Sequence, residues 1–182
     1  DDFKKECIVL ATDQGLNQNA VSENNDHSLV LLNSIVSRFY IPYFSLSKVA
    51  QLVKRAQIIH LMSHWTIINV VVYFMARFYK KPYTFCPAGT LKSFGRSARL
   101  KKLYNYFVGK KIVENASVCI AITEKEKSDF DVFNIDSAKI ITIPNGILPN
   151  EFYPNKAAEL LFVEKFDLKG VDYILFMGRL NE

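Results

Sequence analysis

The chain has 182 residues, of which 49% are hydrophobic and 13% aromatic. This composition allows one full hydrophobic core and excludes low-complexity and collagen-like classes. The 23 Lys and Arg residues exceed the 18 Asp and Glu residues, which gives a formal net charge of +5. A mild positive excess favours an anionic partner, and phosphates, acidic lipid surfaces and nucleic acid all qualify.

The cysteines and the lengths of the apolar runs indicate in which compartment of the cell the protein is expected. Three cysteines, Cys7, Cys86 and Cys119, lie far apart, and we expect buried, reduced thiols. His60 and His64 alone have zinc-ligand spacing, and two ligands do not make a structural site, so we expect no metal. The charged first residues lack a signal-peptide core, and no apolar run reaches the ~20 residues of a membrane span. We therefore expect a soluble cytoplasmic protein, or one peripheral to the inner face of the cell membrane.

Short apolar runs predict buried strands. They are residues 7–12, 58–62, 83–86, 117–122 and 140–143. Residues 13–27 are polar and predict a long surface connection. Residues 29–36 are apolar again.

Helical patterns lie between the later strands. Ser45 or Ser47 is expected to cap a helix that ends near Arg55. Residues 67–79 are rich in β-branched side chains, so a strand is a possible alternative there. The length of the segment favours a buried helix. Thr123 is expected to cap a further helix.

Residues 97–115 show amphipathic spacing. The positions predicted to share the buried face are Leu100, Leu103, Tyr104, Phe107 and Val108. Basic side chains lie on the remaining faces, so this pattern predicts a helix with a basic exterior.

Because strand and helix alternate, we expect an α/β fold: a Rossmann-like, three-layer domain with a mostly parallel sheet and helices on both faces. The strand at 140–143 stops at Pro144 and is expected to turn through Asn145 and Gly146, residues that accept positive φ. Proline and charged residues then indicate a connector with a helical turn around 157–166. The expected organisation is a domain at 1–154, a connector at 155–171 and the first strand of a second domain at 172–182.

Four segments in this order resemble the GT-B-type glycosyltransferases related to glycogen synthases and bacterial cell-envelope sugar transferases. They are residues 59–65 (IHLMSHW), 81–91 (KPYTFCPAGTL), 120–126 (IAITEKE) and 139–147 (KIITIPNGI), the last followed by Phe152 and Pro154. Residues 176–180 (FMGRL) resemble the first strand of the family's second domain. The resemblance runs from about Ile58 to the C-terminus and implies the N-terminal, acceptor-side half of a GT-B fold.

Three departures limit the comparison with this family. Its members begin with a strand and a glycine-rich loop, and nothing before Cys7 supplies either, so that element is absent or lies outside these residues. The second domain, which binds the nucleotide-sugar and carries paired glutamates, is not in this chain, and we expect the chain alone to be inactive. Many relatives have His where this chain has Ala88.

The resemblance implies sugar transfer from a nucleotide-sugar to a saccharide or lipid-linked acceptor in cell-envelope polysaccharide synthesis. It implies no cofactor beyond the nucleotide-sugar co-substrate and no catalytic metal. Arg179 is expected to contact the donor diphosphate, a surface arginine being the alternative. No catalytic residue can be named.

Candidate acceptor and cleft residues follow the strands, because ligands bind at the carboxyl edge of a parallel sheet. They are Ser63, His64, Trp65, Ala88, Gly89, Thr90, Thr123, Asn145 and Gly146. His64 is expected to reach a sugar hydroxyl and Trp65 to stack on a sugar ring, whereas His60 reads as a core histidine. For Gly89 and Thr90 an ordinary turn is the alternative.

A basic cluster surrounds the helix predicted at 97–115. Its members are Arg96, Arg99, Lys101, Lys102, Lys110 and Lys111. It is either a solvated helix face or a patch that docks on an acidic membrane.

Two other functions remain open from sequence. One is a non-catalytic α/β domain that binds an anionic partner such as RNA, although no RNA-binding signature is present and we expect no nucleic acid. The other is a nucleotide-sugar epimerase of the same architecture. Finally, the apolar run 173–177 has no sheet to join, so we expect it to pack on its own domain or to form a dimer with a second copy.

Overall fold

The computed structural model describes residues 6–13, 28–36, 41–42, 46–92, 97–148, 153 and 155–175. The chain divides into two compact units, Asp1–Pro144 and Asn145–Glu182, which we describe one at a time. None of the described helices is long and apolar enough to cross a membrane.

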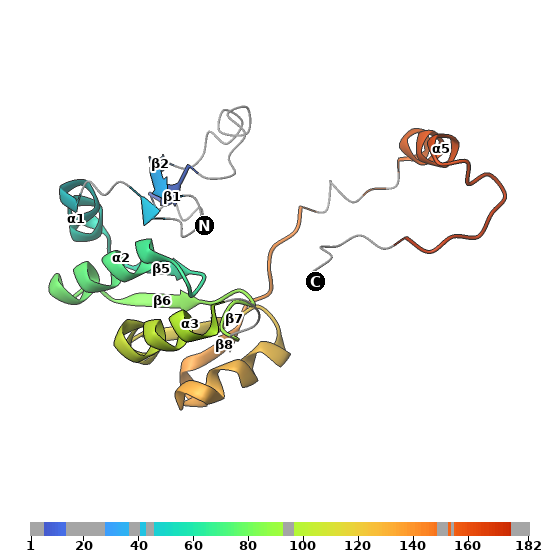
Figure 1. Cartoon of the computed structure of the whole chain (residues 1–182). Coiled ribbons are helices and arrows are strands. Elements are labelled where there is room, and N and C mark those ends of the chain that lie inside the picture. Colours follow the sequence, from blue (N-terminus) through green and yellow to red (C-terminus); the bar gives the residue numbers. More distant parts are fainter. Residues whose placement is uncertain are drawn as a thin grey trace, which may run out of the picture. The chain divides into compact units, whose positions relative to one another are not determined.

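A four-stranded parallel sheet organises the first unit (Figure 1). Its strands are β5 (Ile59–Met62), β6 (Tyr83–Cys86), β7 (Val118–Ala121) and β8 (Ile140–Thr142), in the order β5-β6-β7-β8. All three pairings are parallel. The strands predicted from the four later apolar runs are therefore confirmed, as is the α/β fold class.

The N-terminal part of this unit is less regular than expected. Strand β1 (Ile8–Thr12) pairs in parallel with β2 (Ser28–Leu32). Strand β3 (Ser34–Val36) pairs with β4 (Ile41–Pro42), but this pairing is antiparallel. The expected strand–helix alternation is wrong here, because only residues 37–40 connect β3 to β4 and a parallel crossover needs about a dozen residues.

Helices follow the strands from β4 onward. They are α1 (Leu46–Arg55), α2 (Ile67–Phe78), α3 (Ala98–Tyr104), the π-helix η3 (Asn105–Gly109), α4 (Lys110–Glu114) and the 3-10 helices η4 (Glu124–Phe133) and η5 (Ser137–Lys139). Residues 67–78 are helical, so the helix alternative is confirmed. Ser47 lies inside α1 and cannot cap it.

The core forms on one face of the four-stranded sheet. Alternate residues of the strands, such as Leu61, Phe85 and Cys119, pack against side chains from the helices. The helical members of this buried cluster are Val49, Val53, Val72, Tyr73, Ala76, Ile112, Val113, Phe130 and Phe133.

The opposite sheet face carries His60, Met62, Ile120 and Ile141, none of which belongs to the core cluster. Met62 is 55% exposed and Ile141 43% exposed. Helices on both faces were expected, but within the described residues the buried helical side chains all pack on one face. A second helical layer is not among the described elements.

The helix at 98–114 exposes side chains that were expected in the core. Tyr104 is partly buried against the core and Val108 is buried, but Leu100, Leu103 and Phe107 are 51%, 53% and 62% exposed. The prediction for these three residues is wrong. The π-helical segment adds a residue per turn, so a face read at regular α-helical spacing does not continue through it.

The second unit contains α5 (Lys156–Lys165), which confirms helix in the connector. Asn155 caps it by accepting a hydrogen bond from the Ala158 amide (3.1 Å). Asn145 and Gly146 are exposed, and neither has the positive φ that we expected of an Asn-Gly turn. Ile143 to Leu148 is irregular backbone without a turn, so the turn prediction is wrong.

Candidate functional site

The candidate site lies at the carboxyl edge of the parallel sheet, where β5, β6 and β7 end next to one another. Ser63, His64 and Trp65 follow β5, and the turn 87–90 follows β6. The Ser63 amide donates to the Cys86 carbonyl (2.8 Å), so the two strand ends remain paired up to the site. Parallel strands thus bring residues about 25 positions apart in sequence to one edge, as the sequence predicted.

Backbone strain gathers at these strand ends. Ser63 has φ 70°, Ala88 has φ 48° and Gly89 has φ 79°. The Thr90 amide donates to the Pro87 carbonyl (3.0 Å), closing a turn whose two central residues both have positive φ. A side chain in this region costs about 1–2 kcal/mol, so Ala88 is strained. Strain of this kind persists only where the surroundings hold the turn in place.

Thr90 and Trp65 hold the turn from the β5 side. The Thr90 hydroxyl donates to the Pro87 carbonyl (2.5 Å) and accepts from the His64 amide (3.0 Å). The Trp65 indole N–H donates to the Thr90 carbonyl (2.5 Å). Both partners of the threonine hydroxyl are therefore backbone groups of the site itself.

Glu126 holds the same turn from the β7 side. Its carboxylate is 5% exposed and accepts from the Gly89 amide (Oε1, 2.5 Å) and the Ile122 amide (Oε2, 2.6 Å). The amide of Gly89, one of the candidate cleft residues, is therefore bonded to this carboxylate. The Thr123 hydroxyl accepts from the Glu126 amide (3.2 Å), which confirms the predicted cap.

His64 lies among the buried residues beside the turn 87–90. Its side chain is 1% exposed, and the rings of Trp65, Phe85, Tyr104 and Phe133 surround it. We expected His60 in the core and an open His64 imidazole; the structure reverses this, with His60 exposed and bonded to Thr84 Oγ1 (2.7 Å). The alternation of β5 turns His60 toward the uncovered face.

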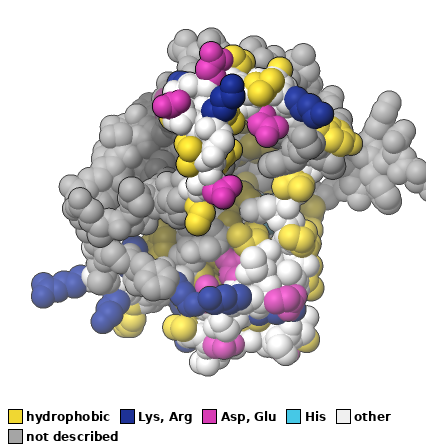
Figure 2. Space-filling model, turned by 90° about the vertical axis from the view of Figure 1, so that its right-hand side faces the viewer, with side chains coloured by type: hydrophobic (Ala, Val, Ile, Leu, Met, Phe, Trp, Pro, Cys, Tyr) yellow, Lys and Arg dark blue, Asp and Glu magenta, His cyan; other side chains and the backbone are white. Residues whose placement is uncertain are grey.

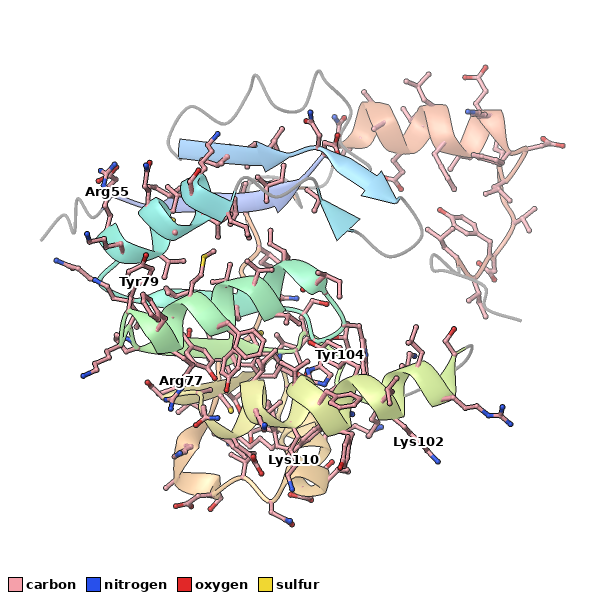
Figure 3. The ribbon with its side chains drawn as sticks, turned by 60° about the vertical axis from the view of Figure 1, so that its left-hand side comes forward. Arg55, Arg77, Tyr79, Lys102, Tyr104 and Lys110 are labelled. Carbon is pink, nitrogen blue, oxygen red and sulfur yellow. The ribbon has the colours of Figure 1, made fainter. Side chains whose placement is uncertain are left out.

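Burial lowers the pKa of His64 to about 4, so the ring is neutral at physiological pH. Nε2 lies 2.8 Å from Asn105 Oδ1, which makes Nε2–H the donor. The Tyr104 hydroxyl donates to the His64 carbonyl (2.6 Å), and burial raises the pKa of this tyrosine. Tyr104 points from the helix toward the β5 loop, whereas Lys102 points outward (Figure 3).

The π-helix brings Asn105 to His64. Gly109 is essential to this geometry, because a Cβ at that position would overlap Asn105 Oδ1 and the Tyr104 ring. π-helical turns inside α-helices often occur at functional sites. Here the turn connects the helix 98–114 to the loop after β5.

A small cavity of about 190 Å³ opens beside the strained turn. It is lined by Gly89, Lys92, Ile122, Thr123, Lys125, Glu126 and Asp129. Lys92 forms an ion pair with Asp129 (2.5 Å). The cavity is smaller than the 300–1,000 Å³ typical of ligand sites, and the amides of Gly89 and Ile122 on its wall are already bonded to Glu126.

The structure brings together some predicted residues and not others. Ser63, His64, Trp65, Ala88, Gly89, Thr90 and Thr123 lie along one edge of the first unit. Asn145 and Gly146 belong to the second unit, and Arg96 and Arg179 lie outside the described residues. Arg99, Lys102, Lys110 and Lys111 are exposed, whereas Lys101 lies with its Nζ 5.4 Å from the centre of the Trp65 ring.

Sequence reasoning missed Glu126, Asn105 and Gly109. For Glu126 a signal existed, because a Thr cap followed three residues later by Glu is a helix-start pattern that directs the carboxylate back toward the preceding strand. No local pattern reveals Asn105 or Gly109. Their roles depend on a π-helix and a partner 41 positions away in sequence.

The geometry agrees with comparisons to known proteins. Residues 6–151 match the family model described as Glycosyltransferase Family 4. No curated protein matches the chain. Solved structures of HepE from Anabaena do: the complex with UDP-glucose has a TM-score of 0.61 at 15% identity, covering 84% of this chain and 40% of HepE. The complex with UDP and glucose has a TM-score of 0.59 at 15% identity, covering 82% and 40%.

At this identity the likeness to HepE establishes the fold, and the chain spans about 40% of HepE's length. The family match covers most of the chain and includes every described strand of the first unit. The parallel sheet, the strained turn after β6 and the capped helix after β7 all lie within it. The chain belongs to Glycosyltransferase Family 4, and its α/β fold with a parallel sheet matches half of a GT-B glycosyltransferase.

Proposed function

We propose that this chain is the acceptor-side half of an enzyme that transfers a sugar from a nucleotide-sugar to a saccharide or lipid-linked acceptor in cell-envelope polysaccharide synthesis. The observation that carries the proposal is the edge of the parallel sheet, where residues after β5, β6 and β7 meet within the family match. HepE, which shares the fold, binds UDP-glucose, so a uridine diphosphate sugar is the first donor to test.

Sugar transfer requires an acceptor hydroxyl held in line, stabilisation of the departing diphosphate, and exclusion of water. The first task falls to the edge of the first unit, where Ser63 and Thr123 carry hydroxyls next to the strained turn. Glu126 and His64 keep that turn rigid, so the acceptor meets a preformed surface rather than one that must order on binding. We propose that Arg179, together with the donor domain, binds the departing diphosphate.

The acceptor assignment can be tested on the 182-residue chain by ¹⁵N NMR. Short oligosaccharides are expected to shift the amides of residues 63–65, 88–90 and 123, while UDP-glucose leaves them unchanged. Ser63→Ala is expected to weaken the oligosaccharide response, and Ser128→Ala, an exposed serine on η4, to leave it intact. Saccharide shifts that map elsewhere, or a response to UDP-glucose alone, would refute the assignment.

Activity needs the full-length enzyme. We expect it to transfer label from a UDP-sugar to an envelope acceptor, and the 182-residue chain to transfer none. Epimerised nucleotide-sugar without transfer would instead favour the epimerase. Transfer by the short chain alone would contradict the division into acceptor and donor halves.

The helix at 98–114 supports a second proposal: contact with an acidic membrane surface. Leu100, Leu103, Tyr106 and Phe107, on α3 and the π-helix that continues it, are 51–80% exposed. Arg99, Lys102, Lys110 and Lys111 flank them on the same helix. An apolar strip bordered by basic residues is the pattern of helices that lie at a lipid interface, where each basic residue adds roughly 1 kcal/mol on acidic lipid.

On the side visible in Figure 2, acidic and basic side chains lie close together, with hydrophobic side chains among them. Co-sedimentation with vesicles is expected to retain the chain on mixed phosphatidylglycerol–phosphatidylcholine and not on phosphatidylcholine alone. Phe107→Ser should release it, whereas Phe78→Ser, an exposed phenylalanine (79%) on α2, should not. Equal partitioning to both vesicles, or a salt-dependent shift with RNA instead, would refute the membrane assignment.

A further inference from the structure

Four consecutive residues of the helix 98–114 face two different surroundings. Tyr104, the last residue of α3, and Asn105, the first of the π-helix η3, contact the loop after β5. The next two residues, Tyr106 and Phe107, are 80% and 62% exposed, and their ring centroids lie 5.2 Å apart. The pair that contacts the loop is therefore joined directly to the exposed aromatic pair.

The inner pair holds the loop by its backbone and by its side chains. The Tyr104 hydroxyl donates to the His64 carbonyl (2.6 Å), and Asn105 Oδ1 accepts from Nε2 of the same histidine (2.8 Å). The Tyr104 ring also contacts the Trp65 ring, with 5.4 Å between their centroids. The His64 amide in turn donates to Thr90 Oγ1 (3.0 Å), so the contacts continue from the π-helix to the turn 87–90.

Lys101 provides another contact between the helix and this loop. Its Nζ lies 5.4 Å from the centre of the Trp65 ring, a distance at which a cation is attracted to an aromatic face. Lys102, the next residue, points outward (Figure 3). One helix thus contacts the loop 63–65 through residues 101, 104 and 105.

The backbone of the π-turn encloses the exposed pair. The Lys110 amide donates to the Asn105 carbonyl, and Tyr106 and Phe107 lie inside the ring that this bond closes. Gly109 makes room for the turn, because a Cβ there would overlap Asn105 Oδ1 and the Tyr104 ring. A contact that restricts Tyr106 and Phe107 therefore also restricts the backbone that positions Asn105.

We propose that lipid contact at Tyr106 and Phe107 orders the loop 63–65 through the π-turn, so that the acceptor edge is set in place at the membrane. The inference rests on the acceptor edge and the membrane contact of the proposed function. Once lipid has restricted the turn, the loop loses less conformational freedom in forming its contacts with it. Such coupling is reciprocal, so an acceptor on the loop also tightens lipid binding. An enzyme built this way favours a lipid-linked acceptor over a free saccharide.

Trp65 is the chain's only tryptophan, so its fluorescence reports on the loop. We expect vesicles of phosphatidylglycerol and phosphatidylcholine to lower the acrylamide quenching of Trp65 in the 182-residue chain, and phosphatidylcholine alone to have no effect. Amide exchange in residues 63–65, followed by mass spectrometry, should slow by about fivefold on the mixed vesicles. Lipids with brominated acyl chains should leave the emission unquenched. Quenching by bromine would show direct insertion of Trp65 and overturn the proposal.

Two variants interrupt the route at different atoms. Asn105→Ala removes the acceptor of His64 Nε2, and Tyr104→Phe removes only the hydroxyl that donates to the His64 carbonyl. Both should still co-sediment with mixed vesicles and show a reduced response at Trp65. Asn105→Asp keeps an acceptor oxygen and should retain the response. So should Asn115→Ala, the matched control, whose amide bonds the Lys111 carbonyl at the end of the same helix.

The outcomes separate this proposal from those on which it rests. A chain that does not co-sediment with mixed vesicles would refute the membrane contact and the coupling together. Co-sedimentation with unchanged quenching and unchanged exchange in the loop would overturn the coupling alone, as would a full response in both Asn105→Ala and Tyr104→Phe. The measurement uses neither donor nor acceptor, so a full-length enzyme without transferase activity would refute the proposed reaction and leave an observed response standing.

Discussion

The Glu126 carboxylate accepts a hydrogen bond from the Gly89 amide across 37 positions of sequence. Its second oxygen accepts from Ile122, so one buried side chain connects the ends of β6 and β7. Hydrogen bonds to a charged group contribute about 1.5–3 kcal/mol each, and a donor left without a partner costs about 1–3 kcal/mol. The strained turn at Ala88 and Gly89 therefore depends on a residue outside it.

We expect Glu126→Ala to lower the free energy of unfolding by about 3 kcal/mol, because two buried amides lose their acceptor. Glu126→Gln retains one acceptor oxygen and should lose about half as much. Urea denaturation measures both. Asp131→Ala, an exposed acid of the same helix η4, is the control and should leave the midpoint nearly unchanged. Equal effects at the two positions would show that the Gly89 contact is unimportant.

Gly109→Ala should destabilise the first unit by about 1–3 kcal/mol, because the added methyl group overlaps Asn105 and Tyr104. The chain has one tryptophan, Trp65, whose ring contacts His64 and Tyr104, so its fluorescence reports on this cluster. We expect the emission to shift to longer wavelength. Gly146→Ala, with nothing within 4 Å of its Cβ, should change neither property. An unshifted spectrum in Gly109→Ala would contradict the role assigned to the π-helix.

The neutral, buried His64 makes stability depend on pH. Its pKa is about 4 in the folded chain and about 6.5 when unfolded, so between these values the unfolded state binds the extra proton. Stability contributed by His64 is complete above pH 6.5 and is lost as the pH falls toward 4, by about 3 kcal/mol in total.

Urea denaturation between pH 7.5 and 4.5 tests this, by comparing the original chain with His64→Gln, which does not titrate. The difference in unfolding free energy between the two should shrink as the pH falls. His60→Gln should track the original chain more closely, because it keeps His64, although partial burial lowers the pKa of His60 as well. A pH-independent difference for His64→Gln would show that the pKa of His64 is the same in the folded and the unfolded chain.

Ala88 and Gly89, which both have positive φ, should respond in opposite ways to reciprocal substitution, one gaining stability and the other losing it. Ala88→Gly removes side-chain strain and should raise stability by about 0.5–1 kcal/mol after the entropy of the unfolded glycine is counted. Gly89→Ala introduces strain at φ 79° although its Cβ would contact nothing, and should lower stability by about 1 kcal/mol. Thermal denaturation measures both; the same sign for the two would argue against the observed backbone.

Thiol reactivity distinguishes the three cysteines. Cys7 is exposed, contrary to the expectation of a buried thiol, while Cys86 and Cys119 are buried. Burial raises the pKa of both buried thiols, that of Cys119 to about 11, which suppresses the reactive thiolate. We expect one rapidly reacting thiol per native chain and three in denaturant. Rapid reaction of a second thiol in the native chain would show that the sheet opens.

By itself the sequence determined the strands β5 to β8, the helices between them and the edge at which Ser63 to Trp65 and Ala88 to Thr90 lie. Continuous apolar runs, cap residues and right-handed crossovers suffice for this, because they are local signals. The family resemblance drawn from the same segments is confirmed by the match at residues 6–151.

Only the tertiary structure decided which face of each element is covered. Alternation shows that His60 and Leu61 point to opposite sides but not which side receives the helices. The same holds for Leu100 and Phe107, which amphipathic spacing assigned to the core and which are 51% and 62% exposed. The contacts of Glu126 with Gly89 and of His64 with Asn105 join residues dozens of positions apart. Such contacts exist only once the sheet has brought its strand ends together, so no local pattern contains them.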